Sequence, residues 1–506
     1  MLSQRSLGWI IWSSVVLSAC SVFFFRCFLT LDGPVHVLHA SALGDALLGH
    51  ARNADGLTYD LSGLDVGLQD PLAYVLLFWS SPESVETMLA ALALFALTSG
   101  AVIYARAMTG EHRPVVLLVL PLSFSALLIL GFLPFLFGIG ICFWSVAWWL
   151  RVERIKMHSL IVVGMLLLLC AFIHRGCVPL LVLLIGLHEW SARRSDERAW
   201  WARWAILPAW ILRVGTVTAP LGLLAYVGYL LFFRDVFEVV PARDALHGLL
   251  TMNAWLLLDS GTEGPLLFAL GLLVIAALTA ACLHLWRAAG GLRFPAPLWA
   301  GLALIALSLI VRTPWADLHY VPERAQVLGV VLLVIWAAAQ ASVQRWSWML
   351  VGAAIVLHGM RTFYLERRMA HFADERAAAA EVAAQLVPGS LAAVQLCADD
   401  WLLLHAVAPI MVRYDGIIVS LPDKLPISRA SSGGESLRQA LRASGRSPEW
   451  LVRCASDATC PKPEQVVVFG GSPQLWLQRN PEVARVLELG YEVTGSSPAW
   501  TVFSKH

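Results

Sequence analysis

The stretch SLIVVGMLLLLCAFIHRGCVPLLVLLIGLHEW, residues 159–190, decides the fold class of this chain. It holds two apolar runs, 159–173 and 177–190, which are separated only by the tripeptide His-Arg-Gly at 174–176. A helix crosses the hydrocarbon core of a bilayer, about 30 Å thick, with about 20 apolar residues, and with fewer where neighbouring helices shield its ends. The stretch therefore predicts two membrane helices joined by a short basic loop.

The composition of the whole chain agrees with this interpretation. Of its 506 residues, 58% are hydrophobic and 14% are charged, whereas a soluble globular domain has about 45–50% and about 25%. The mean hydropathy is +0.70. The 36 Lys and Arg nearly balance the 35 Asp and Glu, so a positive field for binding nucleic acid is not expected. The 22 Trp residues suit the interfaces of a membrane.

Apolar runs that could cross a membrane recur along the first two thirds of the chain. We count eleven candidate spans: 7–29, 85–105, 114–130, 132–150, 159–173, 177–190, 214–233, 264–286, 297–311, 325–340 and 347–365. The first span is too long and too apolar at its end for a removed signal peptide, so we expect it to remain as an anchor. The sequence predicts a polytopic α-helical membrane protein with about eleven transmembrane helices.

The charged residues indicate the domain boundary and the orientation. Residues 367–506 hold 28 of the 71 charged side chains, so we divide the chain into a membrane domain, 1–366, with a long first external loop, 30–84, and a soluble domain, 367–506. With the N-terminus inside, the inner loops hold fourteen basic residues and the outer ones seven, as the positive-inside rule requires. An odd number of spans then places the C-terminal domain outside.

The soluble domain alternates strand-like and helix-like segments. LAAVQL, DGIIVSL and QVVVFGG read as strands, helices are expected around 399–411 and 481–489, and YEVTGSSPAWTVF resembles a hairpin. Strands separated by helices predict a small α/β domain. A disulfide between Cys454 and Cys460 would suit an oxidising periplasm, but the sequence leaves this pairing open.

The first external loop concentrates acidic and His residues. It opens with LDGPVHVLHA, which places Asp32 beside the membrane and His36 and His39 on one face of a helix that begins at Pro34. A carboxylate there could act as a general base towards a hydroxyl, or hold a divalent metal together with Asp70. The alternative is that Asp32 only caps the helix and the histidines are interfacial residues.

Cationic side chains lie on the same outer side in the predicted topology. His174 and Arg175 end the fifth span, and RTPWADLHYVPERAQ, between the ninth and tenth spans, supplies Arg312, His319 and Arg324. Guanidinium groups bind phosphate oxygens in a fork and stay charged, so these residues are candidates to bind an anionic, membrane-tethered substrate. The alternative is that they only extend to the interface from helix ends.

The order of these features resembles the bacterial integral-membrane glycosyltransferases of the C superfamily, specifically a large uncharacterised group. In that group an Asp opens the first external loop and a His follows four residues later, as Asp32 and His36 do here. Three further segments look similar: GFLPFLFGIGICFW (131–144), FIHRGCVPLLVLLIGLHE (172–189) and ADLHYVPER (316–324). Pro134 stands where relatives often carry Asn, and no DxD pair accompanies Asp32.

The resemblance implies transfer of a sugar from a polyprenyl-phosphate carrier to a glycan, lipid or protein acceptor at the outer face of the bacterial inner membrane, without a nucleotide sugar. Asp32 would be the general base for inverting attack, with His36 in support. Arg324, Arg175 and His174 would stabilise the leaving phosphate. The resemblance leaves the use of a divalent metal open.

Two other function classes remain as alternatives. A transporter or flippase of a lipid-linked intermediate usually carries ionisable groups at mid-membrane and often contains repeats with broken helices. We find no internal repeat, and the polar residues gather in outer loops instead. A non-catalytic membrane scaffold predicts that Asp32 is dispensable.

Overall fold

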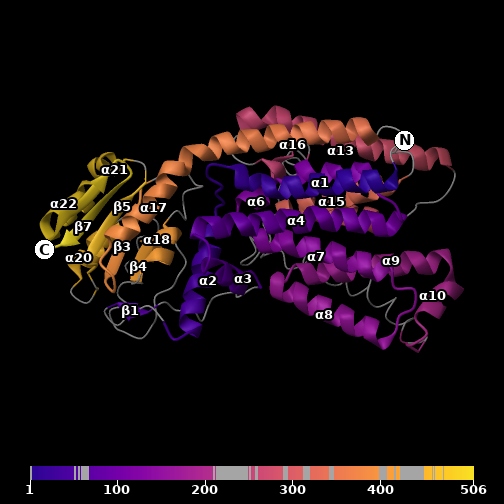
Figure 1. Cartoon of the computed structure of the whole chain (residues 1–506), viewed down its shortest axis with the longest axis horizontal. Coiled ribbons are helices and arrows are strands. Elements are labelled where there is room, and N and C mark those ends of the chain that lie inside the picture. The colour runs from indigo at the N-terminus through magenta and orange to yellow at the C-terminus, as the bar shows by residue number, and fades with distance from the viewer. Residues whose placement is uncertain are drawn as a thin grey trace. The chain divides into compact units, whose positions relative to one another are not determined.

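The computed structural model describes most of the chain. The described residues are 3–50, 53–54, 57–58, 68–208, 211, 249, 252–256, 260–288, 295–310, 320–340, 347–397, 407–414, 417–421, 449–457, 460, 462–470 and 472–506. They form two compact units (Figure 1). The helical unit comprises Met1–Val22 and Ala90–Leu365, and the mixed unit comprises Phe23–Leu89 and Glu366–His506. Each unit is described by itself below.

The helical unit contains the apolar helices that the sequence predicts. Its elements are α1 (Gln4–Cys20), α4 (Pro82–Thr109, which begins in the mixed unit), η2 (Pro114–Leu118), α5 (Val119–Ser123), α6 (Ala126–Ile129), α7 (Leu133–Leu150), α8 (Met157–Ile173), α9 (Cys177–Ser195), α10 (Glu197–Arg203), η4 (Asn253–Trp255), α13 (Ser260–Ala288), α14 (Pro295–Ile310), α15 (Val321–Ala339) and α16 (Ser347–Met369). Helices α7, α8 and α9 lie side by side (Figure 1).

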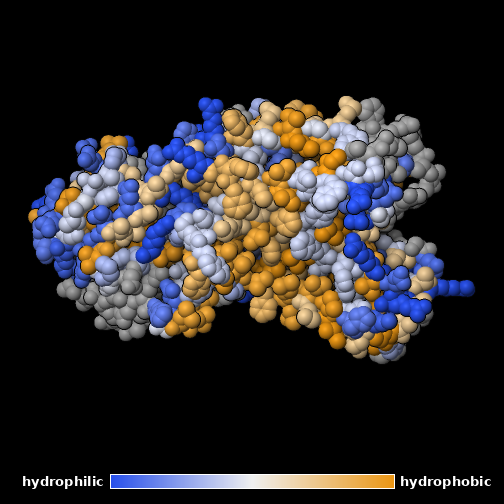
Figure 2. Space-filling view, viewed as in Figure 1, coloured by the Kyte–Doolittle hydropathy of each residue, from blue (hydrophilic) through white to orange (hydrophobic). Residues whose placement is uncertain are grey.

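Six helices in the described part of the chain are long and apolar enough to cross a membrane. They are Gln4–Phe24, Pro82–Thr109, Leu133–Leu150, Glu263–Leu285, Val321–Ala339 and Ser347–Gln385, and three apolar helices are shorter: Pro114–Ser123, Met157–Ile173 and Ala296–Leu309. Apolar side chains such as Met165, Phe172 and Phe268 stay more than 60% exposed, and apolar residues cover much of the helical unit in Figure 2. The chain is therefore a multi-pass membrane protein.

One predicted span is not a single helix, and another lies outside the described residues. The stretch 114–130 is three short helices, η2, α5 and α6, instead of one. Pro121 lies inside this stretch and has no N–H to donate, and a proline also disfavours a helical conformation before it. The chain turns at Phe124, whose ψ is 78°. The span 214–233 falls where the structure describes only 211 and 249 nearby.

Two pairs of glycines bring helices of this unit into close contact. A Cβ atom on Gly100 would lie 2.6 Å from the carbonyl oxygen of Gly140, and one on Gly140 would lie 2.2 Å from the backbone of Ala96. Gly301 and Gly329 each leave only 2.9 Å to the other's carbonyl oxygen. Small residues of this kind let membrane helices pack with their backbones in contact, here α4 on α7 and α14 on α15.

The tail forms a five-stranded sheet with helices on both sides (Figure 1). Its elements are α17 (Ala373–Gln385), β3 (Leu391–Leu396), α18 (Ala408–Arg413), β4 (Ile417–Leu421), α20 (Glu449–Ser456), β5 (Gln465–Phe469), α21 (Pro473–Arg479), α22 (Pro481–Gly490), β6 (Tyr491–Ser497) and β7 (Trp500–Lys505). The strand order is β4-β3-β5-β7-β6; the first three strands are parallel, and β7 is antiparallel to both neighbours.

The predicted strands of the tail are confirmed, as is its hairpin, β6–β7. One face of the sheet packs on α20 and α22 in a core that includes Val466, Val468, Trp450 and Leu487. The structure also forms the disulfide that the sequence left open, between Cys454 and Cys460. Of the expected helix around 399–411, the structure describes the end, as part of α18.

The predicted external loop is largely ordered structure within the mixed unit. It contains α2 (Gly33–Leu47), the short antiparallel pair β1 (Asn53–Ala54) and β2 (Leu57–Thr58), and α3 (Gln69–Leu77). The helix expected from Pro34 is confirmed, with proline in its first turn. Helix α2 contacts α3 and α18.

Candidate functional site

Asp32 immediately precedes α2, where the sequence predicts it. Its backbone occupies the N-cap position, and its carbonyl accepts a hydrogen bond from the N–H of His36 at 3.1 Å. The side chain makes no capping hydrogen bond and is partly exposed. Helix capping by the Asp32 side chain is therefore not the reason for a carboxylate at this position.

The turn that carries Asp32 is fastened by a buried carboxylate. Thr30 donates both its backbone N–H and its hydroxyl to Oε1 of Glu86, at 2.7 and 2.8 Å. The hydroxyl oxygen of Thr30 in turn accepts from the N–H of Gly33 at 3.1 Å. These bonds fix the backbone on both sides of Asp32. Glu86 is only 1% exposed.

Arg376 of α17 compensates the charge of Glu86. Its guanidinium donates to Oε2 of Glu86 and to the carbonyl oxygen of Phe28. A second ion pair also joins the start of α4 to the tail. Arg413 of α18 donates to both carboxylate oxygens of Glu83, at 2.6 and 2.7 Å. A buried charge is tolerated only when it is paired and hydrogen-bonded, and Glu86 satisfies both conditions.

Gly33 has no room for a side chain. A Cβ atom there would lie 2.1 Å from the hydroxyl oxygen of Thr30 and 2.8 Å from the carboxylate of Glu86. Glycine is therefore required for the turn to approach Glu86 this closely.

His36 lies on the first turn of α2 and contacts the start of α3. Its Nδ1 is 3.0 Å from the amide nitrogen of Gln69, so the amide donates and Nε2 carries the hydrogen of the neutral ring. Asp70 follows Gln69 and is 4% exposed. Among the described residues no three His, Cys, Asp or Glu side chains could together hold a metal ion, so we derive no step through a metal.

A second polar cluster lies in the helical unit and joins His174 to Arg324. The guanidinium Nη1 of Arg324 is 3.3 Å from Nε2 of His174. The same guanidinium lies over the rings of Phe132 and Phe135, 4.2 and 5.3 Å from their centroids, in a cation–π arrangement. The structure thus brings together two of the residues that the sequence selects for phosphate binding.

A hydrogen-bond donor faces each ring nitrogen of His174. The backbone N–H of Gly176 lies 3.1 Å from Nδ1, and the guanidinium of Arg324, which can only donate, lies 3.3 Å from Nε2. A neutral imidazole accepts at one nitrogen only, so the tautomer decides which contact is the hydrogen bond. The fork of N–H groups on the Arg324 guanidinium suits an anionic acceptor, such as a phosphate oxygen.

The three other predicted phosphate-binding residues stay predictions. Arg175 is exposed at the turn between α8 and α9. Arg312 and His319 lie outside the described residues. Asp32 and His36 belong to the mixed unit, whereas His174, Arg175 and Arg324 belong to the helical unit.

Glu189, which ends the motif 172–189, has a structural environment. Its carboxylate accepts from the indole N–H groups of Trp149 and Trp204, at 2.7 and 2.6 Å, and pairs with Arg203 at 3.3 Å. These contacts join α7, α9 and the end of α10. Because each carboxylate oxygen already has an indole donor, we assign Glu189 to packing.

Sequence reasoning missed Glu86, Arg376 and Gln69. A lone acid at the start of an apolar span, as Glu86 is in the predicted span 85–105, is expensive unless it is paired, and this signal could have identified it. Nothing in the local sequence indicates that Arg376 contacts Glu86 or that Gln69 contacts His36.

Comparison with known proteins identifies the fold. No family model and no curated protein matches the chain. Two crystal structures of ArnT from Cupriavidus metallidurans share its fold, one in the apo state and one bound to undecaprenyl phosphate. The TM-scores are 0.52 and 0.50 at 12% identity, and the alignments cover 99% of this chain and 98% and 97% of ArnT. The chain thus shares the fold of ArnT over nearly its whole length.

Proposed function

We propose that this protein is a membrane glycosyltransferase that transfers a sugar from a polyprenyl-phosphate carrier to an acceptor hydroxyl at the outer face of the bacterial inner membrane. The observation that carries the proposal is the fold, which the chain shares over 99% of its length with ArnT, in one case bound to undecaprenyl phosphate. Because a fold alone does not establish an activity, the residues of the two clusters carry the rest of the argument.

Asp32 is the proposed general base. Its carboxylate removes the proton from the acceptor hydroxyl as the oxygen attacks the anomeric carbon of the donor sugar. The bond between that carbon and the phosphate oxygen breaks, and the polyprenyl phosphate leaves from the opposite side, so the configuration inverts. His36 lies one helical turn beyond Asp32 and orients the substrate or the carboxylate.

Glu86 and Arg376 are positioning residues in this proposal. A general base must sit within hydrogen-bond reach of the proton that it abstracts. The bonds from Thr30 to Glu86 and from Gly33 to Thr30 hold the turn around Asp32, and Arg376 forms an ion pair with Glu86. The soluble domain therefore takes part in shaping the site through Arg376.

Arg324 and His174 are the proposed phosphate-binding pair. Negative charge grows on the phosphate oxygens as the sugar leaves, and preorganised donors stabilise that charge. The guanidinium of Arg324, beside His174, supplies such donors, and Arg175, Arg312 and His319 are further candidates from the sequence.

We keep the topology that the charges predict. The chain has about eleven spans, the N-terminus is inside, and the division into 1–366 and 367–506 places the soluble domain on the periplasmic side. A divalent metal near Asp32 and Asp70 remains a prediction without a role in this mechanism.

The test compares variants in a strain that lacks the native gene. We expect Asp32→Asn to abolish the change in surface glycan or glycolipid that the native protein restores, because an amide cannot accept the proton. Asp45→Asn, on the same helix but about 20 Å further along it, is the matched control and should restore the profile. Expression and membrane insertion of each variant are checked by immunoblot.

A binding measurement completes this test. Purified protein should bind undecaprenyl phosphate in preference to undecaprenol, and Arg324→Met should weaken that preference by about tenfold, the effect of losing about 1.4 kcal/mol. If deletion of the gene alters the profile and the Asp32→Asn variant restores it, the assignment of Asp32 as the base is overturned. That result favours a scaffold or a transporter. Equal binding of the two lipids overturns the phosphate-dependent donor.

A further inference from the structure

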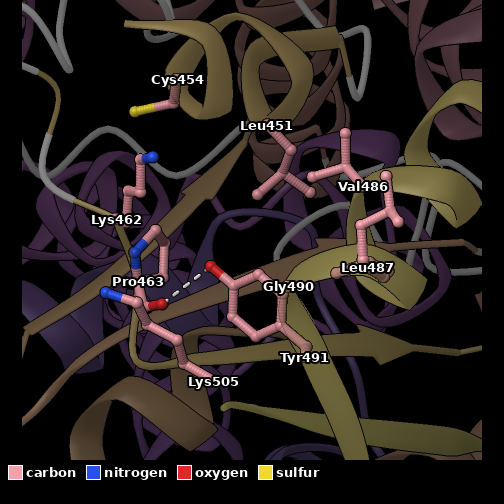
Figure 3. Close-up of a pocket in the computed structure, with 10 residues that line it drawn as sticks. Leu451, Cys454, Lys462, Pro463, Val486, Leu487, Gly490, Tyr491 and Lys505 are labelled. Carbon is pink, nitrogen blue, oxygen red and sulfur yellow. Dashed lines mark hydrogen bonds between the residues drawn. The ribbon is translucent and has the colours of Figure 1, made fainter. Parts of the chain in front are cut away.

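The soluble tail contains a pocket of about 310 Å³ beside its disulfide (Figure 3). Its lining comes from four parts of the tail: helix α20, the segment after the disulfide, the junction of α22 with β6, and the end of β7. Ligand pockets in proteins measure roughly 300–1,000 Å³, so this one fits a small molecule. Neither cluster described above contributes to it.

One wall of the pocket is apolar and rigid. Leu451 and Cys454 from α20 and Leu487 from α22 are each less than 5% exposed and belong to the hydrophobic core of the tail. In Figure 3 the side chains of Leu451, Val486 and Leu487 lie together on one side. Such a wall stabilises a ligand through its apolar part.

The other side of the pocket carries two ammonium groups. Figure 3 shows Lys462 and Lys505 on the side of the pocket away from Leu451, Val486 and Leu487, with Pro463 between their amines. The whole chain has only four lysines, beside 32 arginines, and two of them line this pocket. Among the described residues the lining has no Asp or Glu side chain, and neither amine has an ion-pair partner there.

The backbone near the two lysines is held by contacts within the tail. The disulfide between Cys454 and Cys460 fixes the segment that leads to Lys462. The phenol of Tyr491 donates to the carbonyl oxygen of Pro463 at 2.8 Å, and the backbone of Lys505 pairs with Tyr491 and donates to Glu464. Burial raises the pKa of Tyr491, so its phenol stays neutral and adds no competing negative charge.

We propose that this pocket binds a small amphipathic organophosphate, a phosphate monoester carried on a short apolar group. The phosphate would lie against the amines of Lys462 and Lys505, whose two charges match a phosphate dianion and whose compact ammonium groups suit it as point charges. The apolar group would lie on Leu451, Val486 and Leu487. This proposal does not depend on the glycosyltransferase activity.

The test uses the full-length protein in nanodiscs of phosphatidylcholine, which avoids detergent competing for the apolar wall. Isothermal titration calorimetry measures the binding of hexyl phosphate. We expect Lys462→Gln combined with Lys505→Gln to weaken binding at least about tenfold, with an unchanged melting temperature. Arg479→Gln combined with Arg485→Gln removes the same charge from the same domain outside the lining and should leave the affinity unchanged.

Further ligands separate the two halves of the proposed site. Inorganic phosphate tests the lysines alone, and hexyl glucoside, which is neutral, tests the apolar wall alone; both should bind at least about tenfold more weakly than hexyl phosphate, because each forfeits one part of the contact. The proposal is overturned if hexyl phosphate does not bind, if inorganic phosphate or hexyl glucoside binds equally well, or if the arginine variant weakens binding as much as the lysine variant.

Discussion

At the scale of single residues, two ion pairs involve α17 and differ mainly in burial. Arg376 and Glu86 have side chains 10% and 1% exposed, and Glu86 also accepts two hydrogen bonds from Thr30. Arg26 and Asp374 lie 3.5 Å apart with side chains 67% and 91% exposed. Removing one partner from a buried pair leaves an uncompensated charge, whereas an exposed charge returns to water.

We predict that Arg376→Met lowers the free energy of unfolding by about 3–5 kcal/mol. Asp374→Asn, the matched control on the same helix, should lower it by no more than about 1 kcal/mol. Unfolding of the purified protein in denaturant, followed by tryptophan fluorescence, measures both. Adding Glu86→Gln to Arg376→Met should recover part of the loss. Equal effects of the two single variants would show that burial of the pair is unimportant.

The sequence names candidate residues but not the partners that hold them. It named Asp32 and His36, and it named His174 and Arg324, whose nearest nitrogens the structure places 3.3 Å apart. It did not identify Glu86, which is 56 residues from Thr30, or Arg376, which is 290 residues from Glu86. Local pattern carries no information about contacts at such separations.

At the scale of secondary-structure elements, glycines decide how closely helices pack. Gly140 on α7 lies against the backbone of α4, where a Cβ atom would come within 2.2 Å of Ala96. Gly186 on α9 is exposed and has no atom within 4 Å of such a position. The sequence shows both as glycines in apolar spans and does not distinguish them.

We predict that Gly140→Leu forces α4 and α7 apart, at a cost above the roughly 1–3 kcal/mol typical of overpacking, because the clash is with backbone. Gly186→Leu should change stability little. Melting temperatures of the two variants in detergent, with size-exclusion profiles, make the comparison. A Gly140→Leu protein that melts with the native one would contradict the close contact.

Helix prediction succeeded for the stretch 132–150 and failed for the stretch 114–130, which contains Pro121. The stretch 132–150 became α7 almost residue for residue. The equally apolar stretch 114–130 became three short helices. Hydropathy reports the solvent that a segment prefers, whereas its backbone form also depends on which N–H groups are present.

At the scale of the whole molecule, the disulfide and the topology test each other. The bond between Cys454 and Cys460 spans a sequence separation of 6, and disulfides persist in the periplasm but not in a reducing cytosol. The predicted topology places this domain in the periplasm. The oxidised disulfide and the periplasmic location are therefore consistent with each other.

We predict that the two cysteines are oxidised in freshly isolated membranes and that replacing both by Ser destabilises the tail by about 2 kcal/mol, from the loop-closure entropy of so short a loop. Thiol labelling before and after reduction, followed by mass spectrometry of the peptide, measures the first. Thermal unfolding of the double variant measures the second. Reduced cysteines in cells would contradict the periplasmic location.

The sequence by itself determined that this chain is a multi-pass membrane protein, which parts of the tail form strands and which side chains are candidates for chemistry. Each of these follows from local composition and periodicity. The tertiary structure alone decided the sheet order β4-β3-β5-β7-β6, the fastening of Asp32 by Glu86 and Arg376, the close glycine contacts and the lysine pocket. These depend on contacts between distant residues, which form only when packing and charge compensation are satisfied together.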